Sequence, residues 1–237
     1  MKIYTLAFIV CFIPSTIFAQ MFSVRNVENK PSESNTYLRI GVGVTNFDYT
    51  GSNSVILPEN RLDLEHNSLA IQFESSGLEL GVNFANSIVG LKEQTFLNFS
   101  LYYTNSILLS KSESVQFGIP LRIGSDLVSV TKESSRDKFS QTSISVGAGA
   151  LLSFRIKDKI IFSNTFIPNY GFSSSSGGFF GGSEFSLVGK SRLNFLNLIG
   201  NKNLSIGYDY KYSSYNIEDE NFDYDLKAHL LTIAISL

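Results

Sequence analysis

Along most of the chain, apolar and polar residues alternate with a period of two, and no good helical period of 3.6 is found. Ten segments with this alternation predict ten β-strands. They are Tyr37–Tyr49, Ser68–Glu74, Leu78–Asn86, Thr95–Tyr103, Val115–Gly124, Ser140–Ile156, Lys159–Phe172, Glu184–Asn197, Asn203–Tyr212 and Tyr224–Leu237. We therefore expect an all-β protein.

The connections between these segments alternate between long polar stretches and short turns. Thr50–Asn67 is long, whereas Ser75–Gly77 and Lys157–Asp158 are tight. Thr104–Ser114 is an exception, because it is longer than a turn should be. An even number of antiparallel strands with long loops on one side is typical of a transmembrane barrel. We expect a closed, antiparallel, up-and-down transmembrane β-barrel, with both termini on the short-turn, periplasmic side.

The two faces of the predicted strands differ in the way a barrel requires. From Ser143 to Ser153 the odd positions are mostly small or polar, while the even positions from Ile144 to Ile156 are wholly apolar. A soluble sandwich would alternate too, with its apolar face inward. Small residues and glycine on the polar face favour a narrow lumen over a solvent-exposed surface.

Met1–Ala19 has the pattern of a secretory signal peptide. Lys2 supplies a positive start, and an apolar stretch, Ile3–Ile13, follows. We expect cleavage before Gln20. The predicted division of the chain is a signal peptide at 1–19, a flexible periplasmic lead-in at 20–35 and an outer-membrane β-barrel at 36–237.

Composition removes several other classes of protein. The only cysteine, Cys11, excludes a disulfide framework and a CxxC zinc site. The formal net charge is −2, so there is no basic excess to suggest nucleic-acid binding.

Two segments resemble a known family. Val115–Gly124 reads VQFGIPLRIG, and it resembles the IPL strand of small porin-like outer-membrane β-barrel proteins, the group that includes PorT-type barrels. Val146–Ser173 is similar to that family's paired strands around a tight charged turn. The resemblance covers the mature chain loosely. It implies the barrel fold and an outer-membrane location in a diderm bacterium, and it brings no catalytic residues. Eight strands are commoner in that family than the ten counted here.

The last strand also resembles outer-membrane barrels. Leu231, Ile233, Ile235 and Leu237 occupy alternate positions up to the final residue, as in the C-terminal strand that the barrel-insertion machinery reads. The family usually ends in Phe, and this chain ends in Leu237.

A tight turn at Ser75–Gly77 places Glu74 opposite Glu79, which is unfavourable for like charges unless a cation intervenes. Arg39 is inward by the alternation of its strand and is the candidate cation. We therefore predict a lumen cluster of Arg39, Glu74 and Glu79.

The turn at Leu198–Lys202 predicts that Arg192 faces Asp209 and that Lys190 faces Lys211. The second predicted cluster consists of Arg122, Arg192 and Asp209. Because the interior of so small a barrel is just wide enough for side chains, we expect these charges to plug the lumen. In the alternative, several of them simply face water at the rims.

The loops offer two further candidate contact sites. The acidic run with Glu218, Asp219, Glu220, Asp223 and Asp225 has ligands suited to calcium or to divalent ions bridging lipopolysaccharide, or it is a solvated charged loop. Phe179 and Phe180, flanked by glycines, either dip into lipid, contact a partner protein or fold over the barrel mouth.

Few residues of the sequence are suited to catalysis. His66 lies near Asp63 and Glu65 in a predicted loop, where a base with a carboxylate partner could form. No serine lies in a GxSxG turn, and His229 is expected on the outward series of the last strand. We expect no enzyme and no cofactor.

The function expected is therefore a structural or accessory role in the outer membrane, with a larger envelope assembly as one setting. A narrow passive pore and a surface adhesin remain alternatives. The expected partners are outer-membrane lipid and lipopolysaccharide, the insertion machinery through the C-terminal strand, and an envelope protein, but no nucleic acid.

Overall fold

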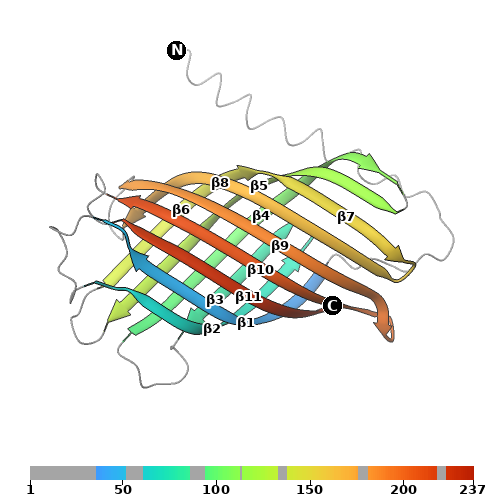
Figure 1. The fold of residues 1–237 in the computed structure, drawn as a ribbon, viewed down its shortest axis with the longest axis horizontal. Coiled ribbons are helices and arrows are strands. Elements are labelled where there is room, and N and C mark those ends of the chain that lie inside the picture. Colours follow the sequence, from blue (N-terminus) through green and yellow to red (C-terminus); the bar gives the residue numbers. More distant parts are fainter. Residues whose placement is uncertain are drawn as a thin grey trace, which may run out of the picture. The chain divides into compact units, whose positions relative to one another are not determined.

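The computed structural model describes residues 36–51, 61–85, 94–112, 114–132, 138–175, 181–217 and 223–237. These residues form eleven strands in one antiparallel sheet (Figure 1). The strands are β1 (Thr36–Tyr49), β2 (Leu64–Ser75), β3 (Leu78–Ala85), β4 (Gln94–Lys111), β5 (Val115–Lys132), β6 (Lys138–Ala148), β7 (Ala150–Lys157), β8 (Ile160–Ser175), β9 (Gly182–Ile199), β10 (Lys202–Ile217) and β11 (Tyr224–Ser236). The predicted signal peptide and lead-in lie outside the described residues. Within the described ranges, no helix is long and apolar enough to cross a membrane.

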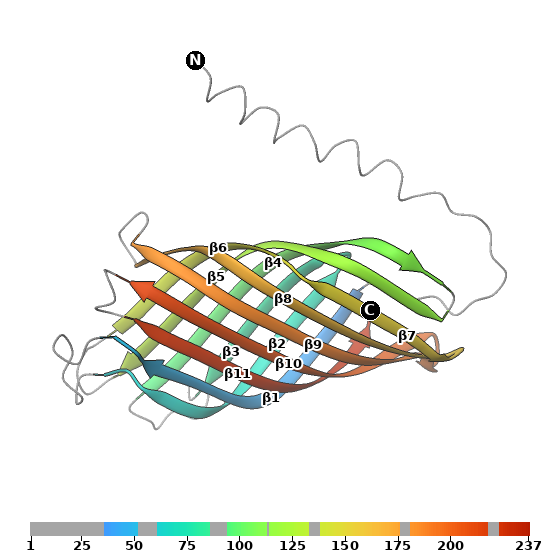
Figure 2. The same cartoon turned by 45° about the horizontal axis from the view of Figure 1, so that its top comes forward.

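The sheet closes into a barrel, because β1 pairs with β11 and every strand has a neighbour on both sides (Figure 2). Paired residues followed around the wall from Tyr37 return to β1 at Tyr49, twelve residues further along. Such a stagger over ten strand positions corresponds to strands tilted by about 40° from the barrel axis. The predicted closed antiparallel barrel is confirmed.

The eleventh strand arises because one strand of the ten-position barrel is interrupted. β6 and β7 lie end to end, and both pair with β5 and with β8. Gly149 separates them and donates a backbone hydrogen bond to the carbonyl of Pro120 at 3.0 Å, but proline has no N–H to return. On the other side, the register of β8 places Pro168 opposite Ala148. Two prolines thus break the ladder on both sides of the same point.

Some strands are longer than the alternation predicts. β4 continues to Lys111, so the connection predicted as Thr104–Ser114 is a short turn, and this prediction was wrong. The physical reason is a β-bulge between Leu108 and Ser110, which disturbs the period of two. In the turn, the Val115 N–H donates to the Ser112 hydroxyl at 2.9 Å.

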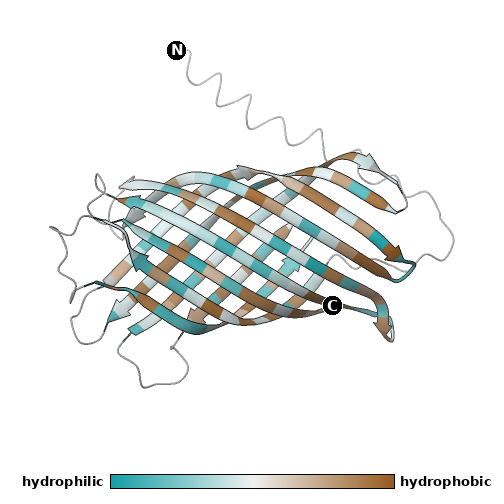
Figure 3. Ribbon diagram, viewed as in Figure 1, coloured by the Kyte–Doolittle hydropathy of each residue, from teal (hydrophilic) through white to brown (hydrophobic). Residues whose placement is uncertain are grey.

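Hydrophobic and hydrophilic residues alternate along the strands (Figure 3). The outward-facing residues are mostly apolar, and the inward-facing ones are polar or small except at the end nearest the long connections. Leu231 on β11 is 66% exposed and Ile40 on β1 is 54% exposed, and both point outward. On β1 the outward series is apolar from Leu38 to Val44 and becomes polar at Asn46. We refer to these outward-facing apolar residues of the wall as the apolar belt.

The end of the lumen nearest the long connections is filled by apolar side chains, which we name the aromatic layer. The ring of Phe47 stacks on Tyr224 with centroids 4.6 Å apart and meets Phe139 edge-on at 4.8 Å. The layer comprises Phe47, Leu62, Leu64, Ala85, Phe96, Val128, Val130, Phe139, Tyr215, Ile217, Tyr224 and Leu226.

Candidate functional site in the lumen

Charged side chains fill the lumen between the aromatic layer and the short turns. On β1, for example, buried Arg39 lies on the short-turn side and Phe47 lies near the loops. We name the charged group the ion-pair layer. It comprises Arg39, Glu74, Glu79, Tyr102, Arg122, Asp126, Lys190, Arg192, Asp209 and Lys211.

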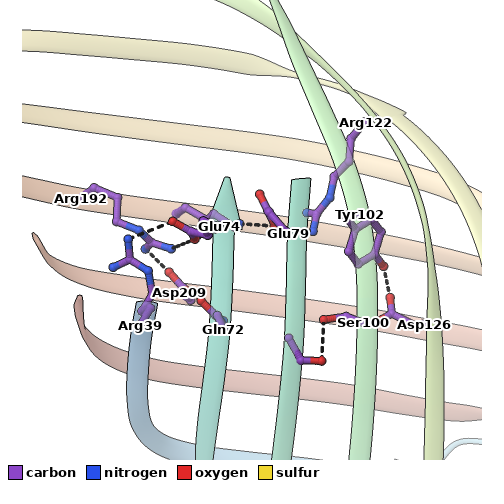
Figure 4. Close-up of polar contacts among 12 residues, drawn as sticks. Arg39, Gln72, Glu74, Glu79, Ser100, Tyr102, Arg122, Asp126, Arg192 and Asp209 are labelled. Carbon is purple, nitrogen blue, oxygen red and sulfur yellow. Dashed lines mark hydrogen bonds and ion pairs between the residues drawn. The ribbon is translucent and has the colours of Figure 1, made fainter. Parts of the chain in front are cut away.

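Glu74 is the centre of this layer (Figure 4). Its carboxylate accepts from Arg39 Nη2 at 3.1 Å and from Arg192 Nη2 at 3.4 Å, and Lys190 Nζ lies 3.9 Å away. These cations come from β1 and β9, which are not adjacent in the sheet. Glu74 therefore links walls of the barrel that the backbone does not connect directly.

Glu79 lies directly opposite Glu74 in the β2–β3 register, as the tight turn predicts. Two facing carboxylates repel each other. Lys190 Nζ lies 2.5 Å from Glu79, and Arg122 Nη2 lies 3.2 Å from it. Because Lys190 approaches both carboxylates, the like-charge pair is neutralised by a cation from the far wall and not by Arg39 alone.

Arg192 and Asp209 form an ion pair, and Gln72 Nε2 donates to Asp209 at 3.3 Å. They are not directly opposite each other, because Asp209 pairs with Lys190 and Arg192 with Gly207. The predicted β9–β10 register was wrong by two residues. A β-bulge between Lys202 and Leu204 causes the shift, and it could not be read from the length of the turn.

The predicted meeting of Lys190 with Lys211 was also wrong, for the same reason. Lys211 lies opposite Val188, and its Nζ binds Asp126 at 2.7 Å. Asp126 also accepts from Asn98 Nδ2 at 3.1 Å and from the Tyr102 hydroxyl.

The six charged residues singled out from the sequence thus lie in one layer and not in two clusters. Arg122 connects the parts, because its guanidinium binds Glu79 and lies 3.7 Å from the centre of the Tyr102 ring. Sequence reasoning missed Tyr102 and Asp126 as members of this layer. Both are inward by the alternation of their strands, which is the signal that could have found them. A cavity of about 80 Å³ lies beside these side chains, and apolar residues such as Val188 and Leu226 also line it.

The other candidate residues do not converge. His66 is paired across the sheet with Thr45, while Asp63 accepts from the Tyr49 N–H at 2.6 Å. Outward-facing His229 is hydrogen-bonded through Nδ1 to the Tyr208 hydroxyl at 2.6 Å. No three His, Cys, Asp or Glu side chains of the described residues are placed to hold a metal ion.

The structure describes only part of the acidic run, namely Asp223 and Asp225. Asp223 accepts from the Ile217 N–H at 2.7 Å, and Asp225 accepts from the Tyr212 hydroxyl at 3.0 Å. Glu218, Asp219 and Glu220 lie outside the described residues, as do Phe179 and Phe180.

Fold and lumen together define a closed antiparallel β-barrel with a filled interior. No family model matches the chain, and no curated protein matches it. Among solved structures, the chain is similar to the outer membrane protease OmpT from Escherichia coli, with 11% identity, a TM-score of 0.45, and 89% of this chain and 98% of that chain covered.

Two further solved structures are similar with lower TM-scores. Neisserial surface protein A has 14% identity and a TM-score of 0.35, over 85% of this chain and 96% of that one. Ail, the attachment invasion locus protein of Yersinia pestis, has 14% identity and a TM-score of 0.26, over 86% and 99%. The fold of the present chain rests on its own strand pairing.

Proposed function

We propose that this chain is an integral outer-membrane β-barrel with a closed lumen, serving as a structural or accessory component of the outer membrane. The observation that carries this proposal is the filling of the lumen by two successive layers, one of ion pairs and one of aromatic side chains. A passive pore needs a continuous water path, and the burial of Phe47 and Phe96 among the described residues argues against such a path at that level.

The apolar belt supports the membrane location. Large apolar side chains cover the outside, including Val42, Ile144 and Ile233, each more than half exposed. In water such a surface would be an aggregation hazard, whereas in hydrocarbon it is the stable arrangement. Closure of the sheet also matters, because it leaves no unpaired strand edge to face lipid.

Tyrosines on the outer wall also support a location in the membrane. Tyr208 and Tyr210 on β10 point outward and contact the His229 ring, with centroids 6.2 and 5.0 Å away. Aromatic side chains of this kind form girdles at membrane interfaces. On β11, the exposed Leu231 and Ile233 continue the outward apolar series to Leu237, which supports recognition of this strand by the insertion machinery.

Conductance tests the closed lumen. Folded protein is added to planar lipid bilayers, and a shift in gel mobility between unheated and boiled samples shows that the barrel is closed. We expect heat-shifted protein that gives no single-channel steps. Reproducible steps from the same preparation would overturn the closed lumen and favour the pore.

The accessory role needs its own test. Mild solubilisation and pull-down should recover other envelope proteins, and replacement of Phe179 and Phe180 by serine should remove them if those side chains make the contact. The adhesin would be favoured if the barrel always purifies alone and if cells that carry it bind a surface in a way that depends on its loops. The absence of catalysis stays a prediction.

A further inference from the structure

Glu184 on β9 is a buried carboxylate whose charge the ion-pair layer does not use. Its side chain points into the lumen and is 0% exposed. Neither carboxylate oxygen makes a well-formed hydrogen bond to the described residues. The strongest charge interactions of this carboxylate are with Asp126, which repels it, and with Lys211, whose ammonium is already bound by Asp126.

Hydroxyl groups surround this carboxylate, and they also lack well-formed hydrogen bonds. Ser186 and Ser213 lie directly opposite each other in the β9–β10 register, and Ser143 and Ser173 do so in the β6–β8 register. All four hydroxyls are buried, and none makes a well-formed hydrogen bond within the described residues. Ser143 and Ser213 lie close enough to Glu184 for their hydroxyls to interact with its carboxylate.

The phenol of Tyr215 completes the group. Tyr215 lies directly opposite Glu184 on β10, it is 1% exposed, and its hydroxyl makes no well-formed hydrogen bond within the described residues. Gly171, opposite Glu184 on the other side, adds no side chain to fill the space. Oxygen atoms from four strands therefore face one buried negative charge.

This arrangement is costly for an ionised carboxylate unless something binds the oxygens, whereas a protonated carboxyl would avoid the cost. A buried, unpaired carboxylate is disfavoured by far more than the net stability of a domain allows. Facing serines normally hydrogen-bond to each other across a sheet, yet these two pairs do not. A cation among the oxygens would satisfy the carboxylate and the hydroxyls together.

We propose that Glu184, with the hydroxyls of Ser143, Ser173, Ser186, Ser213 and Tyr215, forms a binding site for a small monovalent cation, Na⁺. The donor set is oxygen only, which excludes the soft-ligand chemistry of zinc and copper. Calcium sites take six to eight oxygens and commonly several carboxylates, whereas Asp126 is already paired here. One negative charge among neutral hydroxyls matches one positive charge.

The test is thermal unfolding of the full chain, folded in detergent micelles, in NaCl, KCl and choline chloride at one ionic strength. We expect the midpoint to rise saturably with Na⁺ and to stay low in choline. Glu184→Gln should abolish the dependence on Na⁺. Equal midpoints of the wild type in all three salts would overturn the site.

Serine variants provide a matched pair. Ser213→Ala keeps the carboxylate and should raise the half-saturating Na⁺ concentration by tenfold or more. Ser205→Ala removes another buried, unpartnered hydroxyl of the same strand and should leave that concentration unchanged.

Two further results keep the proposal decidable. If Glu184→Gln does not fold, the width of the sodium-23 NMR line is measured instead. Broadening by the wild type but not by Ser213→Ala would support the site, and equal broadening by both would overturn it. If Glu184→Gln is as stable as wild type in every salt, the carboxyl is protonated and the cation site is wrong.

Discussion

The ion-pair layer and the aromatic layer fill the same lumen by opposite means. In the aromatic layer, Phe47, Phe139 and Tyr224 gain stability simply by leaving water, and any well-packed apolar neighbour serves. In the ion-pair layer, each charge needs particular partners. Glu74 depends on Arg39 and Arg192, which come from two different strands.

The difference concerns specificity as much as stability. A buried ion pair gains little over apolar residues of the same volume, but the loss of one partner is severe. The ion-pair layer therefore ties β1, β2, β3, β4, β5, β9 and β10 into one arrangement, whereas the aromatic layer tolerates repacking. Four experiments test this contrast, from the largest expected effect to the smallest.

Removing Arg192 should be the most damaging single change. Arg192→Met leaves Glu74 short of one cation and Asp209 without its guanidinium, and we expect a loss of about 4 kcal/mol in the free energy of unfolding. Urea unfolding in vesicles measures it. The double variant Arg192→Met/Asp209→Leu should recover part of the loss, and a double variant less stable than the single one would contradict the argument.

In the aromatic layer, Phe47→Ala should cost about 3 kcal/mol, because it deletes a fully buried ring and leaves a cavity. Phe47→Leu should cost about 1 kcal/mol, since packing is largely kept. Because the Phe47 ring carries no charge, neither loss should change between low and high salt. A strong salt dependence for Phe47→Ala would erase the distinction between the layers.

Alkaline pH should act on the aromatic layer through Tyr224, which lies past the end of the apolar belt, opposite Tyr49. Burial raises the pKa of Tyr224 to about 12, so the folded barrel prefers the neutral phenol. Its contribution is intact below pH 10, the ordinary tyrosine value, and is lost as pH rises from 10 towards 12. We expect a loss of about 1 kcal/mol, allowing for solvent screening. Tyr224→Phe should remove that part of the pH profile.

The smallest effect is expected on the outer wall. Tyr208→Phe removes the hydroxyl that is bonded to His229 and should cost about 0.5 kcal/mol, because both side chains remain partly exposed. The outward variant Leu231→Val serves as a control without a hydrogen bond. A loss as large as that for Phe47→Ala would mean that the outer wall, and not the lumen, dominates stability.

Alternation predicted the strands and their faces well, because a period of two follows directly from strand geometry. It also predicted Glu74 opposite Glu79, since the turn at Ser76 and Gly77 is tight and both residues adopt positive φ. The β9–β10 register failed at a bulge, which depends on local strain and not on a residue pattern.

The joining of the two predicted clusters could not be derived from pairing at all. Lys190 approaches Glu74 and Glu79 across the lumen, between strands that are not neighbours in the sheet. Such contacts depend on the curvature and diameter of the closed wall. The oxygen group around Glu184 was missed for the same reason, because its serines come from four strands, β6, β8, β9 and β10.

The interruption at Gly149 affects local opening of the barrel wall. Gly149 and Pro120 face each other as a hydrogen-bonded pair, so the Gly149 carbonyl points at a nitrogen without a hydrogen. A Cβ at Gly149 would lie 1.9 Å from the Phe166 carbonyl oxygen, so the backbones there are held close by the absence of a side chain. Where the ladder has the fewest bonds to break, local opening costs least. We therefore expect the backbone amides beside Gly149 to be the first in the wall to exchange with deuterium.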